Sequence, residues 1–109
     1  MSEVLITEEL VKYIKDFVDV NFQDASFDSK IRGMIEDGIV ELRSYFGASE
    51  ETEIDFSQPG KERMLLKNYV LYAINKMTDE FYRSYQREIT SVRIKYETLG
   101  KREDNNEKE

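Results

Sequence analysis

Two residue types that often perform catalysis and bind metals, cysteine and histidine, are absent from this 109-residue chain. Their absence excludes disulfides, thiolate and imidazole metal sites, and catalysis by a Cys or His nucleophile or base. Carboxylates, basic residues and tyrosines are among the side chains that can still do chemistry.

The carboxylates do not have the spacing of a known site, although Asp and Glu number 23. Asp16, Asp19 and Asp24 lack the spacing of a calcium-binding loop and the glycine at its turn. The neighbours Glu36–Asp37 and Glu50–Glu51 diverge on a helix or lie in a loop. No glycine-rich phosphate loop is present. We therefore expect a protein that is not an enzyme and that has no metal and no cofactor.

A mixture of aromatic and basic residues lies in the C-terminal third of the chain. It consists of Phe81, Tyr82, Tyr85, Arg83, Arg87, Arg93 and Lys95. Such mixtures can bind single-stranded nucleic acid. Two acids, Glu88 and Glu97, dilute this patch, and a net charge of −7 disfavours phosphate. Nucleic-acid binding is therefore the lesser hypothesis, and we expect the aromatic residues to lie in the core or at an interface.

Tyrosines in this region are the main candidates for a protein interface. Tyr72 and Tyr82 fall outside the apolar stripe of the predicted helix, and tyrosine is enriched at interfaces. Half-exposed surface positions are the alternative. The candidates for contact with a neighbouring subunit or partner are Tyr69, Tyr72, Tyr82, Arg83, Tyr85 and Arg87.

Three helices are expected to position these residues. The first spans residues 8–18, with Thr7 as its N-cap and two acids in its first turn. The second spans residues 29–46, with Asp28 as its N-cap and Gly47 as a left-handed stop. Gly33 and Gly38 each cost this helix about 1 kcal/mol relative to alanine. Either the helix tolerates them, or another helix approaches closely there.

An acidic loop over residues 48–60 follows the second helix and ends in a Pro-Gly turn. Its length is typical of loops that are mobile or functional, and these remain two alternatives. The alternation of Ile54 and Phe56 is compatible with a short extended piece. The candidates for docking residues are Glu50, Glu51, Glu53, Asp55 and Phe56.

The third helix is expected to be long, because no Gly or Pro interrupts residues 61–99. A helix over 61–88 would measure about 42 Å, whereas a globule of this size is about 34 Å across. It must overshoot its domain or bend. Residues 89–99 fit a helix or a strand, and we favour a continued or kinked helix ended by Gly100. The sequence thus predicts an all-α domain over 1–99, a bundle of three main helices, with a disordered charged tail over 100–109.

Charge is unevenly distributed along the chain. Residues 1–60 carry a net charge of −9, whereas residues 61–99 carry +3. Subunits could pack acidic surface against basic surface, and ordinary solvated faces are the alternative. No apolar run is long enough to cross a membrane, and no signal sequence opens the chain. We therefore expect no membrane contact and a reducing cytoplasm.

The order of these motifs resembles the small head–tail connector, or adaptor, proteins of long-tailed bacteriophages and related prophages. The resemblance covers about residues 5–90. It rests on a short capped helix, the Tyr45-Phe46-Gly47 end of the second helix, an acidic loop closed by Pro59-Gly60, and a long helix from Leu65 into Phe81-Tyr82-Arg83.

The resemblance implies structural work in a virion. Such proteins form a ring beneath the portal protein, extend the DNA channel without binding DNA specifically, and receive a further connector or tail-completion protein. The isolated chain is expected to be a monomer in the host cytoplasm and to join the phage neck on assembly. The long helix would pack against neighbours, and the segments that reorder on docking would be 48–58 and the tail past Leu99. The alternative is a cytoplasmic helical protein-interaction or regulatory module.

Overall fold

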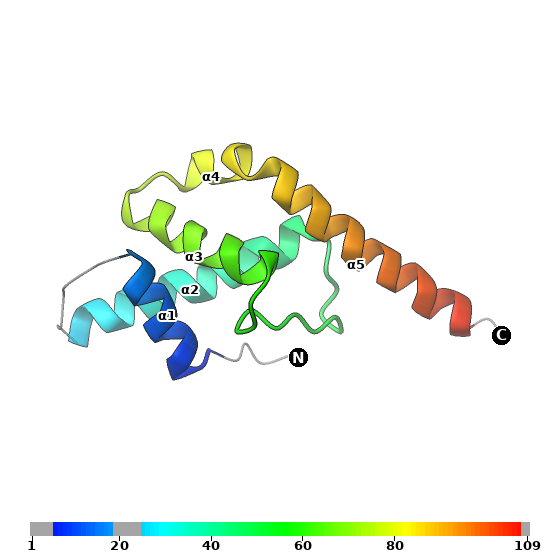
Figure 1. Ribbon diagram of the computed structural model, residues 1–109, viewed down its shortest axis with the longest axis horizontal. Coiled ribbons are helices and arrows are strands. Elements are labelled where there is room, and N and C mark those ends of the chain that lie inside the picture. Colours follow the sequence, from blue (N-terminus) through cyan, green and yellow to red (C-terminus); the bar gives the residue numbers. More distant parts are fainter. Residues whose placement is uncertain (1–5, 19–24, 108–109) are drawn as a thin grey trace.

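The computed structural model describes residues 6–18 and 25–107, and this part of the chain is helical with no strand. Its helices are α1 (Glu8–Val18), α2 (Ala25–Tyr45), α3 (Lys61–Ile74), α4 (Thr78–Ser84) and α5 (Gln86–Glu107) (Figure 1). The all-α class is therefore confirmed. The expected number of three helices is wrong, because the third predicted segment is divided into α3, α4 and α5.

The first helix has the bounds that the sequence predicted. Thr7 caps it: its Oγ1 accepts a hydrogen bond from the Leu10 backbone N–H at 3.1 Å. The Thr7 carbonyl accepts the first helical bond, from Val11. Glu8 and Glu9 occupy the first turn, where the helix dipole favours negative charge.

The second helix begins earlier than predicted, at Ala25, so the assignment of Asp28 as its N-cap is wrong. Asp28 lies in the first turn, and its carboxylate accepts a hydrogen bond from Lys15 of α1. Residues 19–24, between the first two predicted helices, lie outside the described residues. At the other end, Gly47 has a φ of 66°, which confirms the predicted left-handed stop.

The third helix ends at Ile74, so the predicted continuous helix over 61–88 is wrong. Lys76 has a φ of 58°, and the N–H of Met77 donates to the Tyr72 carbonyl at 2.8 Å. The Lys76 N–H donates to Ala73 at 3.1 Å, which completes a Schellman turn. Glycine usually takes the left-handed position of this turn. Here a lysine takes it, and for that reason the sequence showed no break.

The fifth helix includes residues 89–99, in agreement with the favoured alternative. It continues through Gly100 to Glu107, so the predicted stop at Gly100 and the disordered tail are wrong for residues 100–107. Residues 108–109 lie outside the described residues. Figure 1 shows α5 running beyond the other helices. The molecule measures 55 × 28 × 21 Å and has a radius of gyration of 15.1 Å, compared with about 13 Å for a compact domain of this length.

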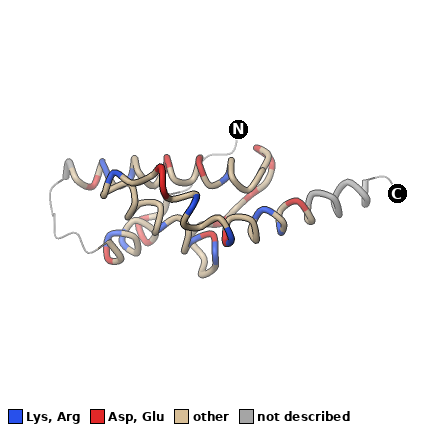
Figure 2. Tube along the Cα trace, turned by 90° about the horizontal axis from the view of Figure 1, so that it is seen from above, with Lys and Arg blue, Asp and Glu red and all other residues tan. Residues whose placement is uncertain are grey.

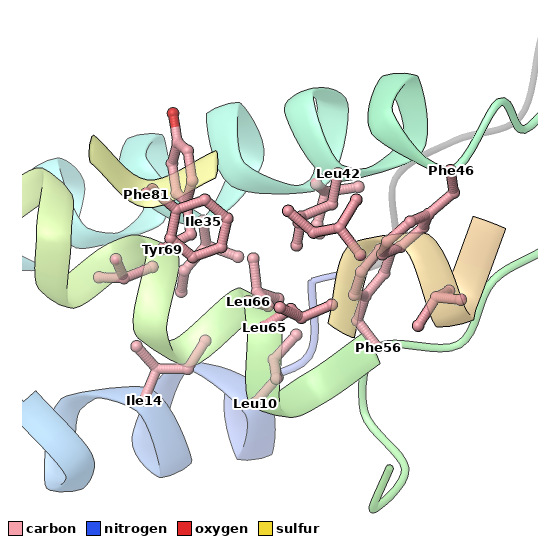
Figure 3. Packing of buried hydrophobic residues seen from close by; sticks show 14 of the residues in the cluster. Leu10, Ile14, Ile35, Leu42, Phe46, Phe56, Leu65, Leu66, Tyr69 and Phe81 are labelled. Atoms are coloured by element: carbon pink, nitrogen blue, oxygen red, sulfur yellow. The ribbon is translucent and has the colours of Figure 1, made fainter. Parts of the chain in front are cut away.

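The core is built around α3, which packs against α1, α2, α4 and α5. Aliphatic and aromatic side chains from these helices and from the α2–α3 connection pack together in the core (Figure 3). They are Leu10, Val11, Ile14, Ile31, Ile35, Ile39, Leu42, Phe46, Phe56, Leu65, Leu66, Tyr69, Val70, Phe81, Ile89 and Val92. This core holds α4 and the first part of α5 against α2 and α3.

The two glycines of α2 have different surroundings. A Cβ atom on Gly38 would lie 2.7 Å from Tyr69 Cδ1 and 2.9 Å from Leu66 Cδ1, both on α3. The close-approach alternative is therefore correct at Gly38. A Cβ atom on Gly33 would have no neighbour within 4 Å among the residues that the structure describes.

Candidate functional site

Three of the predicted interface tyrosines meet inside the molecule. Phe81 of α4 is fully buried, and its ring makes edge contacts with Tyr69 and Tyr72 at centroid distances of 5.4 and 5.6 Å. Tyr85 packs on Phe81 at 5.0 Å and on Tyr72 at 5.8 Å. This aromatic cluster attaches α4 to α3. Tyr69 is only 8% exposed, so most of its surface serves the core.

The other three interface candidates, on α4 and α5, differ in their exposure. Tyr82 is half-buried, and its ring meets Tyr45 of α2 edge-on at 5.0 Å. Burial, together with a hydrogen bond and charge repulsion from Glu41, raises the pKa of Tyr45 to about 12. Arg83 and Arg87 are exposed. Of the six candidates, these two arginines present the most accessible side chains.

The loop between α2 and α3, for which the sequence left a mobile and a functional alternative, is packed and hydrogen-bonded. Phe56 is 5% exposed and belongs to the core. The Asp55 carboxylate accepts hydrogen bonds from the Ser57 hydroxyl and backbone N–H, and these bonds lower the pKa of Asp55. The remaining docking candidates, Glu50, Glu51 and Glu53, are exposed carboxylates. The loop therefore offers charge but no apolar anchor.

A polar contact between α3 and α5 was not predicted. The Glu62 carboxylate accepts hydrogen bonds from Lys95 at 2.8 Å and from the Tyr96 hydroxyl at 2.6 Å. Burial opposes ionisation of Glu62, but the two hydrogen bonds together outweigh it and lower its pKa. Burial and the Glu62 charge raise the pKa of Tyr96. Tyr96 also stacks on Phe46 at 6.1 Å, so this residue joins α5 to both α2 and α3.

A pocket lies beside this contact, between the end of the loop and α5. Its lining residues are Asp55, Gln58, Pro59, Gly60, Lys61, Glu62, Ser91, Val92, Lys95 and Tyr96. Its charged groups already have partners within the chain, since Lys95 pairs with Glu62 and Lys61 donates to Ser91 at 2.8 Å. Among the described residues, no three acidic side chains come close enough together to hold a metal ion.

The basic residues do not form one nucleic-acid surface. Figure 2 shows acidic and basic positions interspersed along the helices. Lys95 is paired with Glu62, and Phe81 is buried. On the opposite side of α3, Arg63 lies 4.0 Å from the centre of the Tyr13 ring, and Lys67 lies 4.4 Å from that of Phe17. These two cations therefore cover aromatic rings of the same chain, and those rings are not open faces on which nucleotide bases could stack.

The largest exposed apolar side chains on α5 are Ile94, at 56%, and Leu99, at 43%. Leu99 lies one turn past Tyr96, which contacts Phe46 and Glu62. Leu99 thus extends the apolar stripe of Val92 and Tyr96 by one residue, and it is exposed. Elsewhere, exposed apolar side chains occur singly, as Phe17, Val40 and Met77.

No helix in the described part of the chain is long and apolar enough to cross a membrane. Comparison of the chain with protein-family models, with curated proteins and with solved structures gives no match.

Proposed function

We propose that this protein is a structural subunit of a phage neck, a head–tail connector that forms a ring under the portal protein and extends the DNA channel. The observation that carries the proposal is the projection of α5 beyond the helices that cover its base (Figure 1). Such a helix is suited to contact a neighbouring subunit or the layer above or below it.

The energetics of α5 support this role. Its 22 residues extend about 33 Å. In the first part of α5, Ile89 and Val92 are buried in the core. Further along the helix Tyr96 is half-buried, and Leu99 is exposed. Most helical stability in proteins comes from the packing of an apolar face, so the uncovered end of α5 is its less stable part. A partner that covers Leu99, the last large apolar residue of α5 in the sequence, would stabilise the projecting end.

The acidic surface supports a channel role. Glu50, Glu51 and Glu53 are exposed on the α2–α3 loop, and Glu36 and Glu41 are exposed on α2. A surface of this sign repels the phosphates of passing DNA and does not bind them. DNA would then slide through a ring whose inner wall carried these residues.

The test is assembly with the portal protein encoded nearby. Sedimentation and negative-stain electron microscopy of the purified chain, alone and mixed with portal, should show rings or an added layer on the portal. A chain that stays monomeric or dimeric and ignores the portal would refute the connector. That result would favour the alternative, a helical protein-interaction module.

Matched surface variants locate the contact. Ile94→Ser and Leu99→Ser remove exposed apolar side chains from α5 and should weaken the added layer. Val40→Ser is the control, since Val40 is 60% exposed but lies on α2. All three proteins should unfold at similar urea concentrations, because these side chains contribute little to the core. Equal effects of the three variants on assembly would contradict a role for α5.

A further inference from the structure

The connection between α3 and α4 is short and strained. It consists of residues 75–77, and Lys76 has a φ of 58°. Residues other than glycine avoid this left-handed region because Cβ crowds the following carbonyl. Among the described residues, Lys76 is alone in combining a positive φ with a side chain.

The sequence at this connection contains no strong helix breaker. Residues 74–78 read Ile-Asn-Lys-Met-Thr and contain neither glycine nor proline. Lysine is a good helix former. Asn75 and Thr78 are weaker helix formers, but neither breaks a helix as glycine or proline does. A straight helix from Lys61 through Ser84 is therefore compatible with the local sequence and would relieve the strain at Lys76. Contacts made further along the chain, above all by Phe81, hold the bend in place.

Those contacts join two separable halves of the molecule. The half after the connection, α4 and α5, forms an arm. Its Phe81 packs on Tyr69, and its Tyr82 packs on Tyr45. Its Tyr96 donates to Glu62. The three contact partners of the arm, Tyr69, Tyr45 and Glu62, precede the connection. A second copy of the chain presents the same three residues in the same arrangement.

We propose that the chain exchanges this arm with a second copy. Residues 75–77 act as the hinge, α3 and α4 join into one helix, and each copy's α2–α3 surface receives the α4–α5 arm of the other copy. Short hinges under strain promote such exchange, because the open form loses no core contact and relieves the hinge. The exchange concerns two copies of this chain alone and does not depend on the portal.

Crosslinking distinguishes exchange from docking between surfaces. In the closed chain, Lys61 Nζ of α3 lies 2.8 Å from Ser91 Oγ of α5. The chain has no cysteine. The double variant Lys61→Cys, Ser91→Cys can therefore be treated with a short bis-maleimide, after chromatography with light scattering over a range of concentrations. In an exchanged dimer, the crosslink joins two chains on a denaturing gel. A dimer whose crosslinks stay within one chain, or a monomer at every concentration, overturns the proposal.

Two variants of Lys76 test the hinge. Lys76→Gly relieves the closed bend and disfavours the open helix, so the dimer dissociation constant should rise about tenfold per hinge and about a hundredfold per dimer. Lys76→Ala keeps both the strain and the helix preference, and should change this constant less than about threefold. Because neither change removes a core contact, both proteins should fold. Equal dissociation constants for the two variants overturn the role of the hinge.

Discussion

Alanine should stabilise the protein at Gly33 of α2 but not at Gly38 of the same helix. Both positions are helical, so alanine gains about 0.5–1 kcal/mol of helix propensity at each. At Gly33 nothing described lies within 4 Å of the new methyl group, and the gain should appear in full. At Gly38 the methyl group would lie 2.7 Å from Tyr69 and 2.9 Å from Leu66.

The clash at Gly38 decides the magnitude. Real Cβ atoms do not approach carbon this closely, so α2 and α3 must separate or both side chains must shift. The Tyr69 ring has little freedom, because Phe81 packs against it at 5.4 Å. Overpacking of this kind costs about 1–3 kcal/mol. After the propensity gain is subtracted, Gly38→Ala should be neutral to about 2 kcal/mol destabilising, and the two variants should differ by about 1–3 kcal/mol.

Urea unfolding followed by circular dichroism measures this difference. Thermal unfolding provides a second readout, since 1 kcal/mol corresponds to about 4 °C for a chain of this size. The double variant should equal the sum of the single effects, because only Gly38 faces α3. Equal stabilisation by both substitutions would refute the close contact between α2 and α3.

Four further outcomes are expected. Phe56→Ala should lower the free energy of unfolding by about 3–5 kcal/mol, whereas the exposed Glu51→Ala should change it by less than about 0.5 kcal/mol; similar small effects in urea titrations would mean that the loop is not packed. Lys76→Gly should raise the free energy of unfolding by about 0.5–1 kcal/mol because glycine accepts the left-handed conformation, and a loss of stability in the same titration would contradict the bend. Because the pKa of folded Glu62 lies below its ordinary value of 4.5, its stabilising effect is present above that pH and is lost as the pH falls through the folded pKa; acid titration of Glu62→Gln should therefore show a shallower loss than the parent chain. Because the pKa of Tyr45 is raised from 10.0 to about 12, its effect is present below pH 10 and is lost between pH 10 and about 12; Tyr45→Phe should reduce the alkaline loss of stability in unfolding measurements, and the raised pKa of Tyr96 leaves part of it in place.

Elements with local signals were predictable from the sequence. Thr7 followed by two acids defined the start of α1, and Gly47 defined the end of α2, because each acts through backbone groups a few residues away. Asp28 has the side chain of an N-cap but pairs with Lys15 of another helix, an interaction that sequence spacing does not reveal.

The bend and the α3–α5 contact could not be predicted for the same reason. Lys76 adopts a left-handed conformation because the burial of Phe81 outweighs its local preference. Glu62 and Tyr96 are 34 positions apart, so their hydrogen bond has no local pattern. Tyr69, an interface candidate, and Phe56, a docking candidate, were apolar enough to suit either a core or a partner, and both lie in the core. The role of Arg83 and Arg87 in a subunit contact stays a prediction.

The central place of α3 has a consequence for the order in which the chain folds as it is synthesised. Residues 1–60 leave the ribosome first, with α1 and α2 and a net charge of −9. Until α3 emerges, Leu10, Ile35 and Leu42 lack the residues that cover them, so a nascent chain of this length has no complete core. The surplus of negative charge would keep these early chains apart through mutual repulsion. Once α3 is released, its neighbours on both sides are close along the chain, and such local topology is typical of rapid folding.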